Sequence, residues 1–186
     1  MPFFPSLADN AGPPAIYTKY PEVYGPWSSM SEAMMNGPSP LSQGERELIL
    51  AYAAATAGCE YVQVAHSEVA YAWGIERGLV ERFLEDSGAI KDERLKALLT
   101  FVGKLARTPV DIVRADIDAV LAAGWSEHAL DDAVAVTARA AFMHRLVAAH
   151  GFIPMSREAA MKKAPRRLQH GYVNLYPEFR EQPSTP

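Results

Sequence analysis

Proline placement divides this chain of 186 residues into three parts. Of its 14 prolines, eight fall in residues 1–41 and five follow residue 153, whereas only Pro109 lies in the 112 residues between. Proline interrupts a helix because it lacks an amide donor and its ring clashes with the preceding turn. We therefore expect a helical core domain at 42–153, an N-terminal arm at 1–41 that packs on the core or on a neighbouring subunit, and a C-terminal extension at 154–186.

Apolar residues in the core recur every three or four positions, which is the period of an amphipathic helix. Ser42 and Glu45 form a capping-box pattern, and Ser126 is a good N-cap for a long last helix that Gly151 ends. No segment alternates with period two for long enough to indicate a strand. The sequence thus predicts an all-α fold, with helices at about 42–57, 59–73, 76–85, 95–108, 116–123 and 126–150.

Charge and composition exclude several classes of protein. Lys and Arg number 18 against 22 Asp and Glu, so the chain lacks the concentrated basic surface of a nucleic-acid binder. No apolar stretch is long enough for a membrane helix, and the first residues lack a signal-peptide pattern. We expect a cytoplasmic protein with no nucleic-acid or membrane partner. Its single cysteine, Cys59, cannot form an intramolecular disulfide.

Cys59 follows Gly58 at a predicted helix start, where unpaired amides and the helix dipole favour an anion. This position predicts a lowered thiol pKa and a nucleophilic thiolate. His66 lies two turns further along the same face, about 10 Å away, which is too far for a direct hydrogen bond. Val62 stands between them and cannot relay a proton. Any coupling between Cys59 and His66 must therefore pass through water, through another chain, or through Glu47 on the preceding helix. If Gly58 lets the two helices fold back, the Glu47 carboxylate can face the thiol and act as its base.

Glu47, Cys59 and His66, within LSQGEREL…GCEYVQVAH, resemble the signature of the alkylhydroperoxidase D-like branch of the carboxymuconolactone decarboxylase family. The resemblance extends through Gly124-Trp-Ser and a closing helix that ends Phe-Met-His-Arg-Leu, which is similar to the peroxidase-related subgroup. It spans roughly residues 1–155 and implies an all-helical homo-oligomer with thiol peroxidase activity and a Glu–Cys–His proton relay.

The chain departs from this family at position 62, where the second cysteine of the C-x-x-C motif is replaced by Val62. A disulfide cycle between two thiols is therefore impossible. The resemblance then implies a one-cysteine peroxidase: a hydroperoxide oxidises the Cys59 thiolate to a sulfenic acid, and an external thiol or redox protein reduces it. The residues expected to bind the substrate are Tyr61, Val62, His144 and Arg145.

Two alternatives stay open. The same family contains decarboxylases and lactone-opening lyases without paired cysteines, which would make His66 and Glu47 the acid and base and let Arg145 hold a substrate carboxylate. A catalytically inactive member, with Cys59 as a small buried residue, is the second alternative. We expect no cofactor and no metal, because no closely spaced pair of histidines has metal-ligand spacing.

Overall fold

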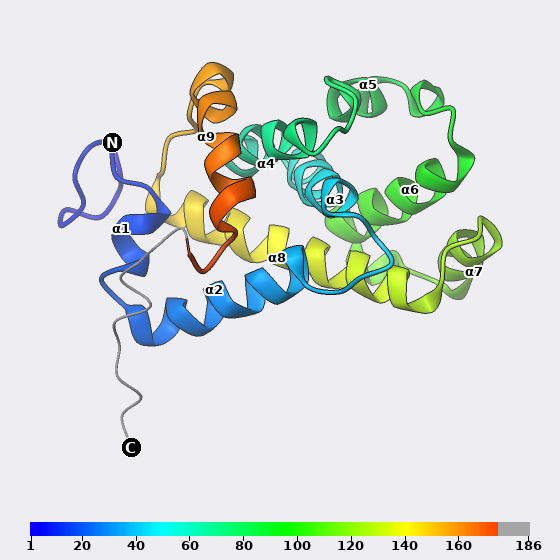
Figure 1. Ribbon diagram of the computed structural model, residues 1–186, viewed down its shortest axis with the longest axis horizontal. Coiled ribbons are helices and arrows are strands. Elements are labelled where there is room, and N and C mark those ends of the chain that lie inside the picture. The colour runs from blue at the N-terminus through cyan, green and yellow to red at the C-terminus, as the bar shows by residue number, and fades with distance from the viewer. Residues whose placement is uncertain (175–186) are drawn as a thin grey trace.

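The computed structural model describes residues 1–174, and every regular element within them is helical. Figure 1 shows these helices, which confirm the all-α expectation. Their bounds are α1 Pro13–Tyr17, α2 Pro21–Asn36, α3 Gln43–Thr56, α4 Glu60–Ala72, α5 Leu79–Glu85, α6 Glu93–Arg107, α7 Arg114–Ala122, α8 Glu127–His150 and α9 Arg157–His170, with single 3-10 turns at Ser87–Ala89 and Pro109–Asp111.

Helix α3 is the centre of the fold. The predicted capping box opens it, since the Ser42 hydroxyl accepts from the amide of Glu45 and the Glu45 carboxylate accepts from the amide of Ser42. An unbroken run from Arg46 to Ala54 is buried, and α3 packs against α4, α5, α6 and α8. Because neighbouring helices pack against every face of α3, a polar side chain on this helix has little freedom to move.

Gly58 makes the reversal between α3 and α4. Its φ of +78° lies in the left-handed region, which side chains with a Cβ rarely adopt, so the chain turns there within three residues. Helix α4 then packs along α3 over most of its length. As a result, Glu47 and His66 lie on facing sides of two adjacent helices.

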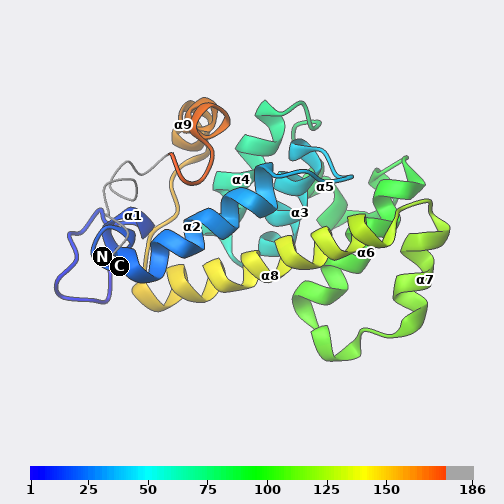
Figure 2. The ribbon, with the colours of Figure 1, turned by 60° about the horizontal axis from the view of Figure 1, so that its bottom comes forward.

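The proline-rich N-terminal segment contains two helices, α1 and α2. Their first turns carry proline, which a helix tolerates at that point because the first amides have no intrahelical acceptor. One more proline, Pro26, lies inside α2 on its exposed side. Figure 2 shows α2 beside the long helix α8, and the two helices are in contact.

The C-terminal extension contains the helix α9, which Ser156 caps through its hydroxyl. It packs across α4, as Figure 1 shows, and carries the chain back toward α2 and α3. Within residues 1–174, no helix combines the length and apolar character needed to cross a bilayer.

Candidate active site

Three buried polar side chains meet between α3, α4 and the end of α9. Nδ1 of His66 lies 2.6 Å from Oε2 of Glu47, and the phenol of Tyr172 donates to Oε1 of the same carboxylate at 2.6 Å. All three residues are buried, with His66 the most exposed at 7%. Both carboxylate oxygens of Glu47 are therefore hydrogen-bonded, and its position and orientation are fixed.

The surroundings set the charge of the Glu47–His66 pair. Burial alone raises the pKa of Glu47, but the contacts with His66 and Tyr172 and the charge of Arg167 together hold it below its ordinary value. Burial lowers the pKa of His66, the charges of Arg139 and Arg167 lower it further, and Glu47 opposes them only in part. Near neutral pH, Glu47 is a carboxylate and His66 is a neutral imidazole.

This charge state also fixes the tautomer of His66. A carboxylate can only accept, so the proton of the neutral ring is on Nδ1 and is donated to Glu47. The second nitrogen, Nε2, then carries a lone pair and makes no hydrogen bond to the part of the chain that the structure describes. An imidazole held this way can act as a general base, because the carboxylate fixes its orientation.

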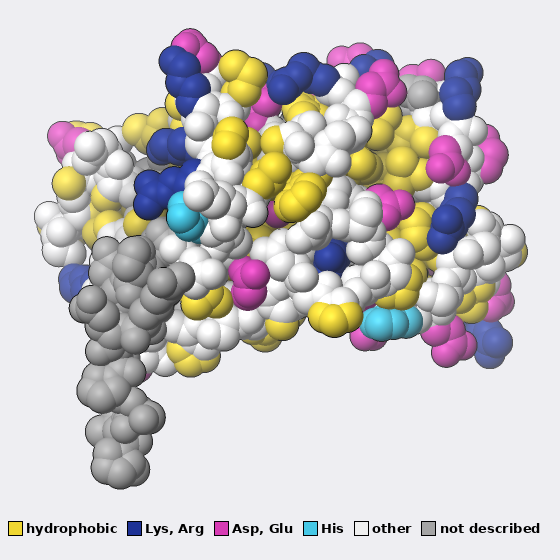
Figure 3. All heavy atoms as spheres, viewed as in Figure 1, with side chains coloured by type: hydrophobic (Ala, Val, Ile, Leu, Met, Phe, Trp, Pro, Cys, Tyr) yellow, Lys and Arg dark blue, Asp and Glu magenta, His cyan; other side chains and the backbone are white. Residues whose placement is uncertain are grey.

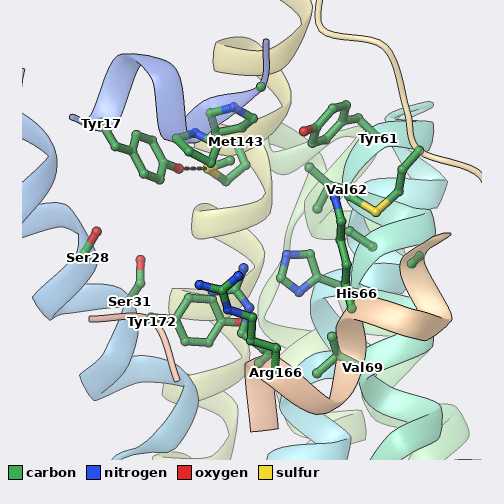
Figure 4. A pocket seen from close by; sticks show the side chains of 18 of the residues that line it. Tyr17, Ser28, Ser31, Tyr61, Val62, His66, Val69, Met143, Arg166 and Tyr172 are labelled. Carbon is green, nitrogen blue, oxygen red and sulfur yellow. Dashed lines mark hydrogen bonds between the residues drawn. The ribbon is translucent and has the colours of Figure 1, made fainter. Parts of the chain in front are cut away.

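His66 lines a cavity of about 620 Å³. The cavity lies between the N-terminal segment, α2, α4, α8 and α9, and Figure 4 shows the imidazole and the Tyr172 ring at its centre. Its apolar wall includes Tyr17, Trp27, Val62, Val69 and Met143. A volume of this size accommodates a small organic molecule. Among residues 1–174, no group of three His, Cys, Asp or Glu side chains is placed to hold a metal ion.

Tyr172 is flanked by two guanidinium groups. Arg139 of α8 lies 4.5 Å and Arg167 of α9 lies 4.3 Å from the centre of its ring. The ring is also nearly parallel to the imidazole of His66, at an interplanar angle of 5° and a centroid distance of 6.4 Å. These contacts hold the phenol in place and bring two positive charges to the cavity wall.

Cys59 lies outside this group. It is the N-cap of α4 and only 4% exposed, and it is not among the described residues that line the cavity. The expected lowering of its pKa is wrong: burial raises the pKa of the thiol, and the amides of Tyr61 and Val62 at the helix start offset only part of that rise. Glu47 pairs with His66 and Tyr172, and no hydrogen bond joins it to Cys59 within residues 1–174.

The other predicted site residues divide into two pairs. Tyr61 and Val62 line the cavity, and Val62 presents a hydrocarbon surface where the resemblance expects a second thiol. His144 and Arg145 do not line it among the described residues; Arg145 is exposed and donates to the carbonyl of Ala141. The proposed carboxylate-binding role of Arg145 therefore has no support from this cavity.

Two residues of the site were missed by sequence reasoning. Arg139 carried a usable signal, because it lies three residues after Val136 and four before Met143, both buried on α8. A charged residue on an apolar helix face marks a function or a buried partner. Tyr172 had no such signal, since it follows α9 and reaches Glu47 only through the tertiary fold.

Comparison with solved structures places the fold among the alkylhydroperoxidase-like helical proteins. A peroxidase-related protein from Silicibacter sp. TM1040 matches with a TM-score of 0.66 and 23% identity, covering 83% of this chain and 94% of that one. A peroxidase-related protein from Ralstonia eutropha JMP134, described as an alkylhydroperoxidase AhpD core, matches with a TM-score of 0.70 and 21% identity, covering 78% of this chain and 76% of that one. At this identity the likeness establishes the fold.

Neither comparison by sequence identifies a relative. No protein-family model matches the chain, and no curated protein matches it.

Proposed function

We propose that this protein is an acid–base enzyme of the decarboxylase or lactone-type lyase class, with His66 as its catalytic base and acid. One observation carries the proposal: His66 lines the cavity while its Nδ1 is held at 2.6 Å by the buried carboxylate of Glu47. This arrangement leaves Nε2 free to exchange a proton with a bound substrate. It requires no thiol and no second cysteine.

His66 can carry out all the proton transfers of the reaction. Nε2 takes a proton from a carbon or oxygen atom of the substrate, and the resulting imidazolium is stabilised by the carboxylate of Glu47. In lactone opening by elimination, Nε2 takes the proton from a carbon next to the ring C–O carbon, the ring C–O bond breaks with its electron pair on the oxygen, and the imidazolium returns the proton to that oxygen. In decarboxylation, Nε2 of the neutral ring takes up one proton from solvent when the anionic acid binds, the carbon–carbon bond to CO2 breaks, and the imidazolium gives that proton to the carbon that keeps the electron pair, which returns His66 to its neutral form.

Tyr172 is a positioning residue in this proposal. Its phenol occupies Oε1 of Glu47, so that Oε2 points to His66. Burial and the charge of Glu47 raise the pKa of Tyr172 well above its ordinary value, which keeps the phenol protonated as a donor at any working pH. The apolar wall at Val62, Val69 and Met143 limits water near the imidazole and strengthens these interactions.

A thiol peroxidase is the second candidate function. It is favoured by Cys59 at the N-terminus of α4 and by the two structural neighbours, both described as peroxidase-related. In that reaction the thiolate attacks the peroxide, the alcohol leaves, and the cysteine sulfenic acid is reduced by two equivalents of an external thiol. It requires α4 to open at its start, because the Cys59 side chain is buried.

One pair of variants separates the two functions. Two assays are applied to the wild-type protein and to the variants Cys59→Ser and His66→Gln. The first uses small carboxylated lactones and 3-oxo acids and measures ring opening and CO2 release. The second measures the consumption of cumene hydroperoxide in the presence of dithiothreitol. The proposal predicts turnover of an acid or lactone that Cys59→Ser retains and His66→Gln reduces by about a hundredfold. Peroxide consumption that Cys59→Ser abolishes, with no turnover of any acid or lactone, would establish the second candidate instead.

A further inference from the structure

Arg139 has a hydrogen-bond donor without an acceptor. Its Nε donates to the hydroxyl of Ser31 at 3.2 Å, whereas Nη1 is buried and has no hydrogen-bond partner among residues 1–174. The residue is 5% exposed, and it lines the same cavity as His66. Arg139 thus brings a buried, incompletely hydrogen-bonded positive charge to the cavity wall.

The contacts of Arg139 do not neutralise it. Its guanidinium lies over the rings of Tyr172 and, at 5.7 Å, Trp27, and both are cation–π contacts rather than ion pairs. No salt bridge joins Arg139 to a carboxylate in the described part of the chain. Burying a charged group without an opposite charge is costly, so this guanidinium has a strong preference for an anion placed beside it.

The rest of the cavity favours the same kind of ligand. Its described lining contains Lys163, Arg166 and Arg167 besides Arg139, and no aspartate or glutamate. Figure 3 shows lysine and arginine side chains gathered along α9 on the side toward α1, where this lining lies. These charges raise the local concentration of anions and steer them toward the cavity.

The apolar residues of the cavity indicate the character of the rest of the ligand. Three apolar lining residues lie close to Arg139. Trp27 is in cation–π contact with it, Met143 is one helical turn further along α8, and the phenol of Tyr17 donates to the sulfur of Met143 at 3.2 Å. A single guanidinium fork with one serine hydroxyl suits the two oxygens of a carboxylate. A phosphate has no apolar part, so it would leave the surface of Trp27 and Met143 uncovered.

We propose that Arg139 binds the carboxylate of a small, largely apolar organic acid, whose body lies against Trp27 and Met143. The acid then lies beside His66, whose pKa already responds to the charge of Arg139. The inference rests on the proposed function only for the fate of the bound acid, because binding is measurable without turnover. It also replaces Arg145 by Arg139 as the residue that recognises the carboxylate.

Calorimetric titration of the full-length protein tests the site. Benzoate is the probe, benzamide is its neutral counterpart of the same shape, and inorganic phosphate is the competing anion. The proposal predicts that benzoate binds at least tenfold more tightly than benzamide, because only the carboxylate pairs with the guanidinium. Equal binding of benzoate and benzamide, or tighter binding of phosphate than of benzoate, would overturn it.

Two arginines of α8 provide a matched pair of variants. Arg139→Gln is expected to weaken benzoate binding at least tenfold, and Arg145→Gln, at an exposed position of the same helix, is expected to leave it unchanged. Equal effects of the two variants would contradict the proposal. If Arg139→Gln does not fold, Arg139→Lys replaces it, and the same weakening is expected because lysine lacks the planar fork.

His66→Gln separates this inference from the proposed function. The variant retains Arg139, so benzoate binding is expected to stay within threefold of the wild type. Loss of turnover in His66→Gln with benzoate still bound supports both proposals. Benzoate binding that depends on Arg139, in a protein without His66-dependent turnover, would contradict the proposed function. It would still support the carboxylate site at Arg139.

Discussion

The phenol of Tyr172 donates a 2.6 Å hydrogen bond to the carboxylate of Glu47, which lies 125 residues earlier in the chain. The other oxygen of that carboxylate holds His66, so the C-terminal extension completes a pair that α3 and α4 begin. A second hydrogen bond holds the C-terminal extension in place, since the backbone amide of Tyr172 donates to the carboxylate of Glu32 on α2. The extension is thus part of the candidate active site.

Removing the phenol of Tyr172 tests this role. Tyr172→Phe keeps the ring and its contacts with Arg139 and Arg167 but deprives Glu47 of a donor. We expect the free energy of unfolding to fall by about 1.5–3 kcal/mol, the range for a hydrogen bond to a charged group. Urea denaturation measures the change, and Tyr20→Phe, at an exposed position, is the control. If Tyr172→Phe is as stable as the Tyr20→Phe control, the hydrogen bond between Tyr172 and Glu47 does not stabilise the fold.

Stability should depend on pH through His66. Because the pKa of His66 is lowered in the folded protein, the unfolded chain takes up the proton first as the pH falls. The contribution of His66 is therefore complete above its ordinary pKa of about 6.5 and is lost below it. The lowered pKa of Glu47 acts in the same direction in a more acidic range.

Urea denaturation between pH 7.5 and pH 5.5 measures this dependence. The wild type and His128→Gln, which changes an exposed histidine, are expected to lose stability together as the pH falls, and His66→Gln is expected to lose less. The opposite trend, with the wild type gaining stability toward pH 5.5, would mean that the imidazole of His66 is charged in the folded protein.

Alkylation of Cys59 tests its environment. Burial hinders access to the sulfur and raises the thiol pKa, so iodoacetamide should react with the native protein far more slowly than with the unfolded chain at pH 7. The native rate should increase only above the ordinary thiol pKa of about 8.5. Mass spectrometry follows the reaction. Fast modification of native protein at pH 7, at a rate matching that in urea, would show an accessible thiolate and support the peroxidase.

The capping box at Ser42 predicts a separate effect on stability. Ser42→Ala removes the hydroxyl that accepts from the Glu45 amide, and we expect a loss of about 0.5–2 kcal/mol. Ser29→Ala, at an exposed position of α2, is the matched control and should change stability by less than about 0.5 kcal/mol. Thermal and urea denaturation compare the two. A loss at Ser42 no greater than that at Ser29 would show that this cap does not stabilise α3.

The helices of the core were predictable because local chemistry marks their ends. Ser42 and Ser126 cap α3 and α8 through their hydroxyls, as expected, and Gly151 ends α8 with a positive φ. Helices α1, α2 and α9 lie outside the predicted core and were not expected, because proline interrupts a helix at most positions. The prolines at the starts of α1 and α2 occupy first-turn positions, where no intrahelical bond is lost.

The site was predictable only in part. A turn at Gly58 was the condition for Glu47 to face the thiol of Cys59. The turn is present, but Glu47 pairs with His66 instead. The expected lowering of the thiol pKa of Cys59 does not occur, because burial outweighs the effect of the amides at the helix start. Arg139 and Tyr172 meet only through the packing of α8 against the C-terminal extension, a long-range contact that no local pattern encodes.

In the candidate active site, a neutral His66 lines the cavity and its Nδ1 proton is held by Glu47. Long-range nitrogen–proton NMR spectra at pH 7 test this arrangement directly, with the His66 signals assigned by comparison with His66→Gln among the 5 histidines. We predict a protonated Nδ1 and an unprotonated Nε2, and a loss of this fixed tautomer in Glu47→Gln. A doubly protonated ring, or a proton on Nε2 with Nδ1 unprotonated, would show that His66 is not the neutral base proposed.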